Sequence, residues 1–257
     1  MKRVKILEYF INPIKINFLL KKITNWCENK KSKSSSYICV SSVHGASESV
    51  FNKKYRKSHN NCDLALADGR PIYWALKLFG FKDVDHLPGY LVTNSICKLA
   101  AKNKLKVGIY GGENYVIRKF KKETQRVYKT IKFRYSYSPP FRSLSLKENK
   151  DIIKKINGSK IDILFVCLGA PKQEIWMHEN QHNLKCVMIG IGAALDYLAK
   201  TKTKSPLILE KLGLAWFFRL IIEPKRLFKR YFIANTTFLI LFTFQLVLFW
   251  LKKIKNI

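Results

Sequence analysis

The sequence is short of acidic residues: 17 Asp and Glu stand against 48 Lys and Arg, a formal net charge of +31. An excess of this size indicates an anionic partner, and nucleic acid, anionic lipid headgroups and phosphorylated substrates are the candidates. A proteome rich in Lys, Ile and Asn would also raise the charge, by scattering single lysines over the surface. Charge alone therefore leaves the class of partner open.

Paired cysteines, repeats and a leader pattern are also missing. The 6 cysteines form no Cys-x-x-Cys pair, which argues against a zinc site and a disulfide framework and suits a reducing cytosol. No repeat with a period of 20–50 residues is visible, which excludes a solenoid. Pro13 and Lys15 interrupt the apolar N-terminal stretch and no small-residue cleavage site follows, so we expect no signal peptide.

A complete nucleotide-binding glycine motif is absent as well. "GIYGGE" (108–113) and "GIGAALD" (190–196) match neither the full G-x-G-x-x-G fingerprint nor a Walker loop. Such glycines either let backbone N–H groups approach a phosphate or simply form tight turns between strand and helix. Asp196 in the second stretch either binds a ribose hydroxyl or caps a helix. The spacing leaves both choices open.

Short apolar runs are present and alternate with segments of helical periodicity. The runs are 37–43, 64–68, 106–112, 161–169 and 185–194, and the predicted helices are 71–79, 90–102, 115–130, 145–157 and 172–183. Continuous Val, Ile and Leu runs separated by helices are typical of parallel strands covered on both faces. The sequence therefore predicts an α/β fold with a Rossmann-like parallel sheet.

Polar and glycine residues gather where these strands end. They occupy positions 41–42, 68–70, 111–113, 169–174 and 190–196. Ligands of doubly wound sheets bind beyond the carboxyl ends of the strands, so we expect the active site at this edge. The stretch "DILFVCLGAPKQEIWMHE" (162–179) would deliver Gly169–Glu174 there, with Trp176 either in the core or stacking on a ligand.

Several acidic and histidine positions admit two interpretations. Asp68 is suited to act as a general base if a desolvated pocket raises its pKa, and equally suited to cap the helix 71–79. The carboxylates of "DVD" (83–85) match the pair with which many nucleotide-sugar enzymes hold a metal, but they lie off every predicted strand end, which favours a solvated loop. His44 is the one histidine near a strand end, where a core or surface role is the simpler interpretation.

The composition changes after about residue 200, which divides the chain into an α/β core (1–199) and a basic appendage (200–257). In the appendage, basic residues are interleaved with aromatic and aliphatic ones, and residues 231–251 carry no charged side chain. A helix of that length, at ~1.5 Å per residue, could cross a ~30 Å hydrocarbon core. We expect a helical, membrane-associating appendage.

Six stretches stand in a characteristic order. They are "LALADGRPIYWALKLFG", "KVGIYGG", "YSPPFRSLSLKE", "ILFVCLGAPKQEIWM", "IGIGAALDYLA" and "SPLILEKLGLAWFFRLIIEPKRLFKRYF". Together they resemble the WecG/TagA/CpsF glycosyltransferases of bacterial cell-surface polysaccharide synthesis. The resemblance extends from about residue 35 to 235, and "GAPKQE" and "GLAWFFRLIIEPKRL" are its specific signatures.

The resemblance implies an inverting hexosyltransferase that uses neither a metal nor a cofactor. Such an enzyme moves a sugar, of the N-acetylmannosamine type or a related hexose, from a UDP donor to an undecaprenyl-diphosphate-linked sugar. Asp68 matches the proposed family base, and Arg219 and Arg226, with Lys229 or Arg230, match basic residues that the appendage brings over the active site. The resemblance places these residues around the substrates: Ser42, Gly69, Gly111, Gly112, Gly169, Pro171, Gln173, Glu174, Gly190, Gly192, Asp196 and Arg230.

The sequence departs from the family pattern at positions on the sugar and acceptor side. Ser42 stands near an expected Asn, His86 replaces an Arg, Leu91 an Asp, and Ala215 a Glu. The nucleotide-side motifs are intact, so we expect catalysis to be retained, with either an N-acetylmannosamine-type sugar or a related hexose as the group transferred. The alternative is a catalytically silent relative that scaffolds a polysaccharide assembly complex.

The apolar stretch 231–251 has basic residues on both sides: 225–230 before it, and Lys252, Lys253 and Lys255 after it. A spanning helix would place one basic cluster outside, which the positive-inside rule disfavours. We therefore expect a peripheral protein on the cytoplasmic face of the cell membrane, attracted by anionic headgroups, with a single transmembrane anchor at 231–251 as the alternative. Because the chain has no recognised nucleic-acid motif and its basic residues lie beside an apolar tail, nucleic acid is not an expected partner.

Overall fold

The computed structural model describes residues 2–29 and 35–255, with side chains as far as Lys252. Its centre is a sheet of 6 strands in the order β4-β3-β8-β7-β5-β6, and every pairing is parallel. The strands are β3 (Tyr37–Ser41), β4 (Leu64–Ala67), β5 (Lys106–Gly111), β6 (Lys132–Tyr137), β7 (Ile163–Cys167) and β8 (Val187–Gly190). The predicted fold class is confirmed.

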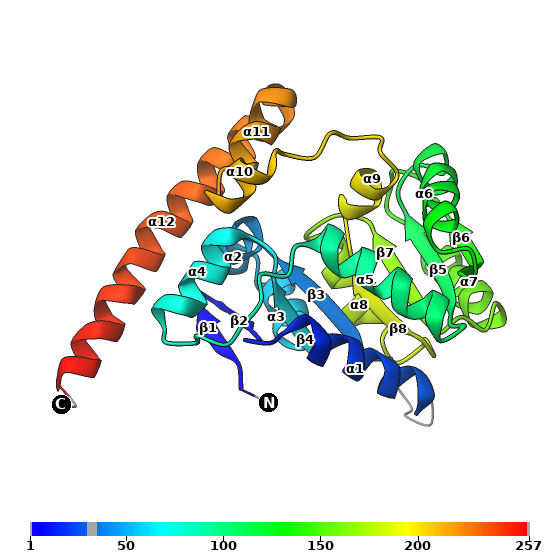
Figure 1. Cartoon of the computed structure of the whole chain (residues 1–257), viewed down its shortest axis with the longest axis horizontal. Helices are drawn as coiled ribbons and strands as arrows, with labels where there is room; N and C mark the ends of the chain where they lie inside the picture. Colours follow the sequence, from blue (N-terminus) through cyan, green and yellow to red (C-terminus); the bar gives the residue numbers. More distant parts are fainter. Residues whose placement is uncertain (1, 30–34, 256–257) are drawn as a thin grey trace.

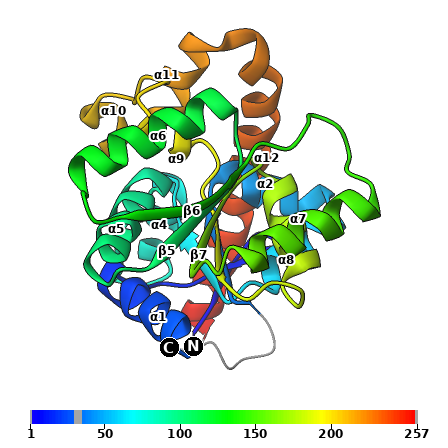
Figure 2. The same cartoon turned by 90° about the vertical axis from the view of Figure 1, so that its right-hand side faces the viewer.

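Helices cover both faces of this sheet, so strands such as β7 and β8 at its centre are buried along nearly their whole length. One face packs against α1 (Ile16–Glu28), α5 (Gly89–Lys102), α6 (Asn114–Val127) and α9 (Ala194–Leu198). The other packs against α2 (Val43–Phe51), α4 (Arg70–Leu78), α7 (Leu146–Gly158) and α8 (Lys172–Asn180), with α3 (Lys53–Asn60) beside α8. Figure 2 shows α1 and α5 on one side of the strands and α7 and α8 on the other.

The expected strands and helices are all present, with ends that differ by a few residues. The run 185–194 is divided, since β8 ends at Gly190 and α9 begins at Ala194. The sequence analysis missed β6, whose side chains are mostly exposed and which forms one edge of the sheet. It also missed α1, α2, α3 and the N-terminal hairpin.

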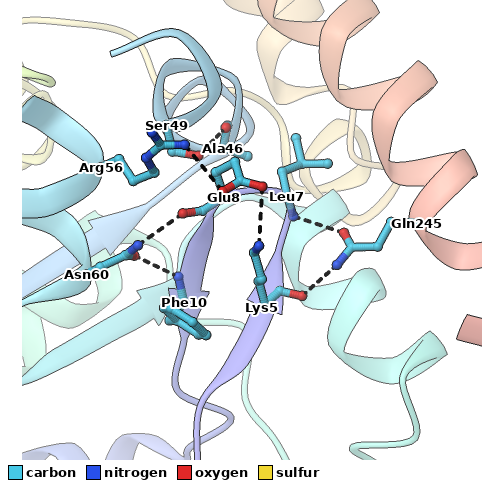
Figure 3. Close-up of polar contacts among 9 residues, drawn as sticks. All are labelled: Lys5, Leu7, Glu8, Phe10, Ala46, Ser49, Arg56, Asn60 and Gln245. Atoms are coloured by element: carbon cyan, nitrogen blue, oxygen red, sulfur yellow. Dashed lines mark hydrogen bonds and ion pairs between the residues drawn. The ribbon is translucent and has the colours of Figure 1, made fainter. Parts of the chain in front are cut away.

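The N-terminal hairpin is made of β1 (Val4–Ile6) and β2 (Tyr9–Ile11), two strands of 3 residues each. Strands this short are held by tertiary contacts. The Asn60 side chain accepts from the Phe10 N–H at 3.1 Å and donates to the Glu8 carbonyl at 3.0 Å (Figure 3). On the other side, the Gln245 amide donates to the Lys5 carbonyl and accepts from the Leu7 N–H, each at 2.9 Å.

Gln245 belongs to the last of the C-terminal helices, which are α10 (Leu207–Lys211), α11 (Ala215–Ile222) and α12 (Pro224–Lys255). In Figure 1, α12 runs beside α2, α4 and the N-terminal hairpin. One face of the helix is buried there: Leu227, Tyr231, Ala234, Phe238 and Phe242. These positions recur every three or four residues, so they form a single stripe.

Three contacts show how α12 is held. The Ser47 hydroxyl of α2 donates to the Ala234 carbonyl at 2.6 Å, and the Phe79 ring lies 5.7 Å from Phe242 and 4.8 Å from Phe249. Helix α12 is therefore docked lengthwise on the α/β core. The two predicted units, 1–199 and 200–257, are not described in full. Outside the described part of the chain lie residues 1, 30–34 and 256–257, and the side chains of Lys253 and Lys255.

Candidate active site

A cavity of about 790 Å³ lies along the carboxyl edge of the sheet. Its wall extends from Asp68, after β4, to the loop after β6, and the appendage contributes side chains from α11 and α12. Parallel strands end at the same edge, so residues far apart in sequence meet there. The cavity is the place predicted for substrates.

Most of the predicted site residues line this cavity. They are Ser42, Asp68, Gly112, Gly169, Gln173, Gly190, Gly192, Asp196, Arg219, Arg226 and Arg230. The predicted residues Gly69, Gly111, Pro171 and Glu174 are not part of its wall. Gly69 is the residue before α4, and Pro171 is the residue before α8.

Asp68 is held in place by backbone groups. Its Oδ1 atom accepts from the Gly89 N–H at 2.8 Å, and its own N–H donates to the Ser41 carbonyl at 3.0 Å. Burial raises the pKa of the Asp68 carboxyl, against the opposing effects of the Gly89 bond and the Arg219 guanidinium. A carboxylate whose pKa is raised in a cavity has the character of a general base.

His86, one of the departures from the family pattern, lies directly behind Asp68. Its Nε2 atom bonds to the Asp68 carbonyl oxygen, and because a carbonyl only accepts, Nε2 is the donor. Burial and the nearby Arg70 charge lower the pKa of His86 to about 4, so the ring is neutral near pH 7. His86 supports the backbone of Asp68 without adding a charge to the site.

The appendage brings three arginines to the cavity wall, Arg219, Arg226 and Arg230, and the first two repel the third. Burial lowers the pKa of Arg230, and the Arg219 and Arg226 guanidinium groups lower it further. Arg226 is paired with Glu223, and the Arg219 guanidinium lies 5.9 Å from the centre of the Tyr197 ring. Clustered guanidinium groups on a cavity wall create a positive potential, which an anionic ligand would relieve.

The linker before α10 and α10 itself are tied to the core next to this site. The Tyr90 hydroxyl of α5 donates to Glu210 at 3.0 Å, and the Lys204 ammonium lies 3.5 Å from the centre of the Tyr90 ring. The Ser205 hydroxyl also donates to Glu210, at 3.2 Å. These contacts, together with the docking of α12, hold the arginines over the cavity.

Gln173 and Glu174 differ in their relation to the cavity. Gln173 lines it, whereas Glu174 is 1% exposed and accepts from the Gln173 amide nitrogen at 2.9 Å. Burial raises the pKa of Glu174 to about 7, although the Gln173 bond opposes the rise. The expected direct contact of Glu174 with substrate is therefore not supported by its position.

At two of the predicted glycines, the surrounding structure explains why the residue has no side chain. A side chain at Gly190 would come within 2.9 Å of both the Gln173 amide nitrogen and Met177 Cε, so only glycine leaves room for that amide. Gly111 has a φ of +98°, and a Cβ there would lie 2.7 Å from the Cys167 carbonyl carbon. Gly111 thus serves the tight turn, while Gly190 serves the site.

Trp176 and Asp196 were each open to two interpretations, and contacts decide that of Trp176. Trp176 is 9% exposed, donates to the Asn149 side chain at 2.9 Å and packs 4.4 Å from Tyr110, so it is a core residue with an edge on the cavity. Asp196 lies in the first turn of α9 and on the cavity wall. Burial raises the pKa of its carboxyl, while Lys202 opposes the rise.

The "DVD" carboxylates have structural partners. Asp83 pairs with Lys15, and Asp85 accepts from the Ile16 N–H at 2.9 Å, so both fasten the start of α1. Among the described residues, no group of three His, Cys, Asp or Glu side chains is arranged to hold a metal ion.

Sequence reasoning missed part of the cavity wall. The loop after β6 contributes Pro139, Pro140, Phe141 and Arg142, and α9 contributes Tyr197. The stretch "YSPPFRSLSLKE" carries this loop and was itself a signal. Without β6, no strand end was available to place it at the sheet edge.

The fold is Rossmann-like, with a ligand-sized cavity at the carboxyl edge of its sheet, and comparison with known proteins identifies the family. The family model described as "Glycosyl transferase WecG/TagA/CpsF family" matches residues 4–251. An N-acetylglucosaminyldiphosphoundecaprenol N-acetyl-beta-D-mannosaminyltransferase of Staphylococcus aureus (strain NCTC 8325 / PS 47) is 30% identical over 178 residues, 68% of each chain. The protein with the same name from strain MRSA252 is 31% identical over 178 residues, again 68% of each chain.

The chain belongs to the WecG/TagA/CpsF family of glycosyl transferases. It is accordingly an enzyme of the hexosyltransferase class.

Proposed function

We propose that this enzyme transfers a sugar from a UDP donor to a sugar linked to undecaprenyl diphosphate, with inversion and without a metal. The names of the Staphylococcus aureus relatives support a lipid-diphosphate sugar as acceptor and an N-acetylmannosamine-type residue as the group transferred. The observation that carries the proposal is the cavity itself, where Asp68 and the three arginines of the appendage line one space.

The reaction is a single displacement. Asp68, oriented by the Gly89 N–H, takes the proton from the acceptor hydroxyl as its oxygen attacks the anomeric carbon of the donor. The bond from that carbon to the UDP oxygen breaks on the opposite face, which inverts the configuration. The diphosphate then gains negative charge, and Arg219, Arg226 and Arg230 stabilise it in the role that a cation has in other enzymes.

The departures from the family pattern concern the choice of sugar more than the chemistry. Ser42 lines the cavity and His86 contacts the Asp68 carbonyl, whereas Leu91 and Ala215 are not part of the cavity wall. We propose that the donor is an N-acetylmannosamine-type sugar or a related hexose, selected in part near Ser42. The intact Asp68 and arginine cluster favour catalysis over a silent scaffolding role.

Turnover tests this proposal. UDP release is measured with a panel of UDP-sugars and a synthetic lipid-diphosphate sugar acceptor, for the full-length protein and the Asp68→Asn variant. We expect one donor to give turnover that Asp68→Asn lowers by roughly 100-fold or more and that EDTA leaves unchanged. Loss of turnover in EDTA would overturn the metal-independent mechanism, and no turnover with any donor would favour the scaffolding role.

We further propose that the appendage (200–257) binds the cytoplasmic membrane surface with α12 lying on it. Within the described part of the chain, α12 is the helix that is both long enough and apolar enough to span a bilayer. Its outward face is rich in exposed apolar side chains. They are Phe228, Phe232, Ile233, Leu239, Ile240, Leu241, Phe244, Val247, Leu248, Trp250 and Leu251.

The docking of α12 favours the peripheral arrangement over a transmembrane anchor. Gln245, well inside the stretch 231–251, bonds to the backbone of the N-terminal hairpin, which carries the charged residues Lys5 and Glu8. A spanning helix would leave these contacts or draw charged groups into lipid. Carbonate extraction of membranes tests this: release of the protein supports peripheral binding, and release by detergent alone supports the anchor.

A further inference from the structure

The turn between β7 and α8 holds a buried polar pair whose second member does not reach the cavity. Gln173 and Glu174 are 4% and 1% exposed. Both lie in the first turn of α8, and the Gln173 N–H donates to the Gly169 carbonyl at 3.0 Å. Keeping a carboxyl group at such a position is unfavourable for folding, so its presence calls for a reason.

The direction of the Gln173 amide follows from its contact with Glu174. The amide turns its NH₂ group toward Glu174, where Nε2 donates to the carboxyl oxygen Oε1 at 2.9 Å. The amide oxygen then faces the other way, toward Gly192, where it would lie 3.4 Å from an added Cβ. The amide rests on two glycines, since its nitrogen lies against Gly190.

The amide oxygen of Gln173 has no hydrogen-bond partner among the described residues, although it is buried. Buried acceptors are normally satisfied, and an orphan beside a cavity invites a donor from a ligand. Gly192, which adjoins this oxygen, lines the cavity, and so does Gln173 itself.

We propose that Glu174 is a positioning residue, which holds the Gln173 NH₂ group so that the Gln173 oxygen accepts a hydrogen bond from a hydroxyl or acetamido N–H of the donor sugar. This inference rests on the proposed sugar transfer. The contact selects a ligand group with a hydrogen to donate. A phosphate or a carbonyl at this point would meet a like acceptor.

The neighbours of Glu174 fit this role. Arg230, which lines the cavity, is close enough to favour the ionised form of Glu174, and Glu48 of α2 opposes it. Glu174 is therefore influenced by the charge of an arginine that lines the same cavity as the Gln173 amide.

A double-mutant cycle tests whether Glu174 acts through Gln173. The value of kcat/KM for the UDP-sugar is measured for the full-length wild type, Gln173→Ala, Glu174→Ala and the double variant. We expect Glu174→Ala to lower kcat/KM about 10-fold in the wild type and less than about 2-fold in the Gln173→Ala background. Equal losses in both backgrounds would overturn the proposal. Ile156→Ala, a buried change on α7, controls for lost stability and should leave the Gln173→Ala effect unchanged.

Deoxy donors identify the ligand group. Removing the hydroxyl or acetamido group that meets Gln173 should lower kcat/KM about 10-fold in the wild type and hardly at all in Gln173→Ala. If every deoxy donor lowers kcat/KM by the same factor in both proteins, Gln173 does not contact the sugar and the proposal fails.

A third measurement needs no substrate, so failure of the proposed function would not obscure the result. With ¹⁵N-glutamine labelling, the side-chain NH₂ signals of Gln173 are assigned by their loss in Gln173→Ala. We expect these hydrogens to exchange slowly in the wild type and in Glu174→Gln, whose amide oxygen can still accept, and fast in Glu174→Ala. Unchanged exchange in Glu174→Ala would overturn the positioning role even if transfer were observed.

Discussion

Replacing Glu174 by glutamine should change how stability depends on pH. The carboxyl has an ordinary pKa of 4.5, and burial raises it to about 7 in the folded protein. The folded chain therefore holds this proton more tightly than the unfolded chain. The stabilisation linked to it is fully present below pH 4.5 and is lost as the pH rises through 7.

The expected size follows from these values. At about 1.4 kcal/mol per pH unit, the interval from 4.5 to about 7 corresponds to ~3 kcal/mol of unfolding free energy. The amide introduced by Glu174→Gln cannot titrate, so the stability of this variant relative to wild type should increase by up to this amount between pH 4.5 and about pH 8.

Urea unfolding of the full-length protein in a non-ionic detergent, followed by tryptophan fluorescence at the two pH values, measures this difference. Comparing the two proteins at each pH cancels the titration of all other groups. Ile156→Ala, which removes no titratable group, should differ from wild type equally at both pH values. A Glu174→Gln difference that is also the same at both would refute the reasoning, because Glu174 would then titrate alike in the folded and unfolded states.

Three further changes test the site and the appendage. Arg219→Ala should lower kcat by roughly 100-fold, and Arg219→Lys, which keeps a charge, should lower it less. An unchanged kcat would show that Arg219 takes no part in the chemical step. Phe242→Ala, which removes the ring against Phe79, should reduce unfolding free energy by about 3–5 kcal/mol, and a change below about 1 kcal/mol in urea unfolding would contradict the docking of α12. Tyr90→Phe removes the bond to Glu210 and should weaken the hold on the appendage by about 1 kcal/mol, seen as faster proteolysis of residues 200–215; an unchanged cleavage rate speaks against this contact.

The parallel sheet was predictable because its signals are local. Apolar runs such as "LALA" in β4 are buried on both faces, and the intervening helices have amphipathic periodicity, as in α6. Strand β6 escaped because an edge strand with exposed side chains carries little apolar signal. The N-terminal hairpin escaped because its strands of 3 residues depend on Asn60 and Gln245, distant in sequence.

The candidate site was predictable in outline for a topological reason. In a parallel sheet every strand ends at the same edge, so Asp68, Gly169 and Gly190 had to meet there once the strands were recognised. The arginines were placed only through the family resemblance. Local patterns in 200–257 predict helices, but say nothing of which face of α12 packs against α2.

Sequence by itself thus determined the sheet, its turns and the side chains available at its edge, because these depend on residue spacing along one element. Tertiary structure alone decided that Gln173 faces the cavity while its neighbour Glu174 is buried behind it. Successive residues of a helix point about 100° apart, and which direction is solvent, cavity or core depends on the elements packed around it. In the same way, the docking of α12 through Phe238, Phe242 and Gln245 decides where the arginines lie.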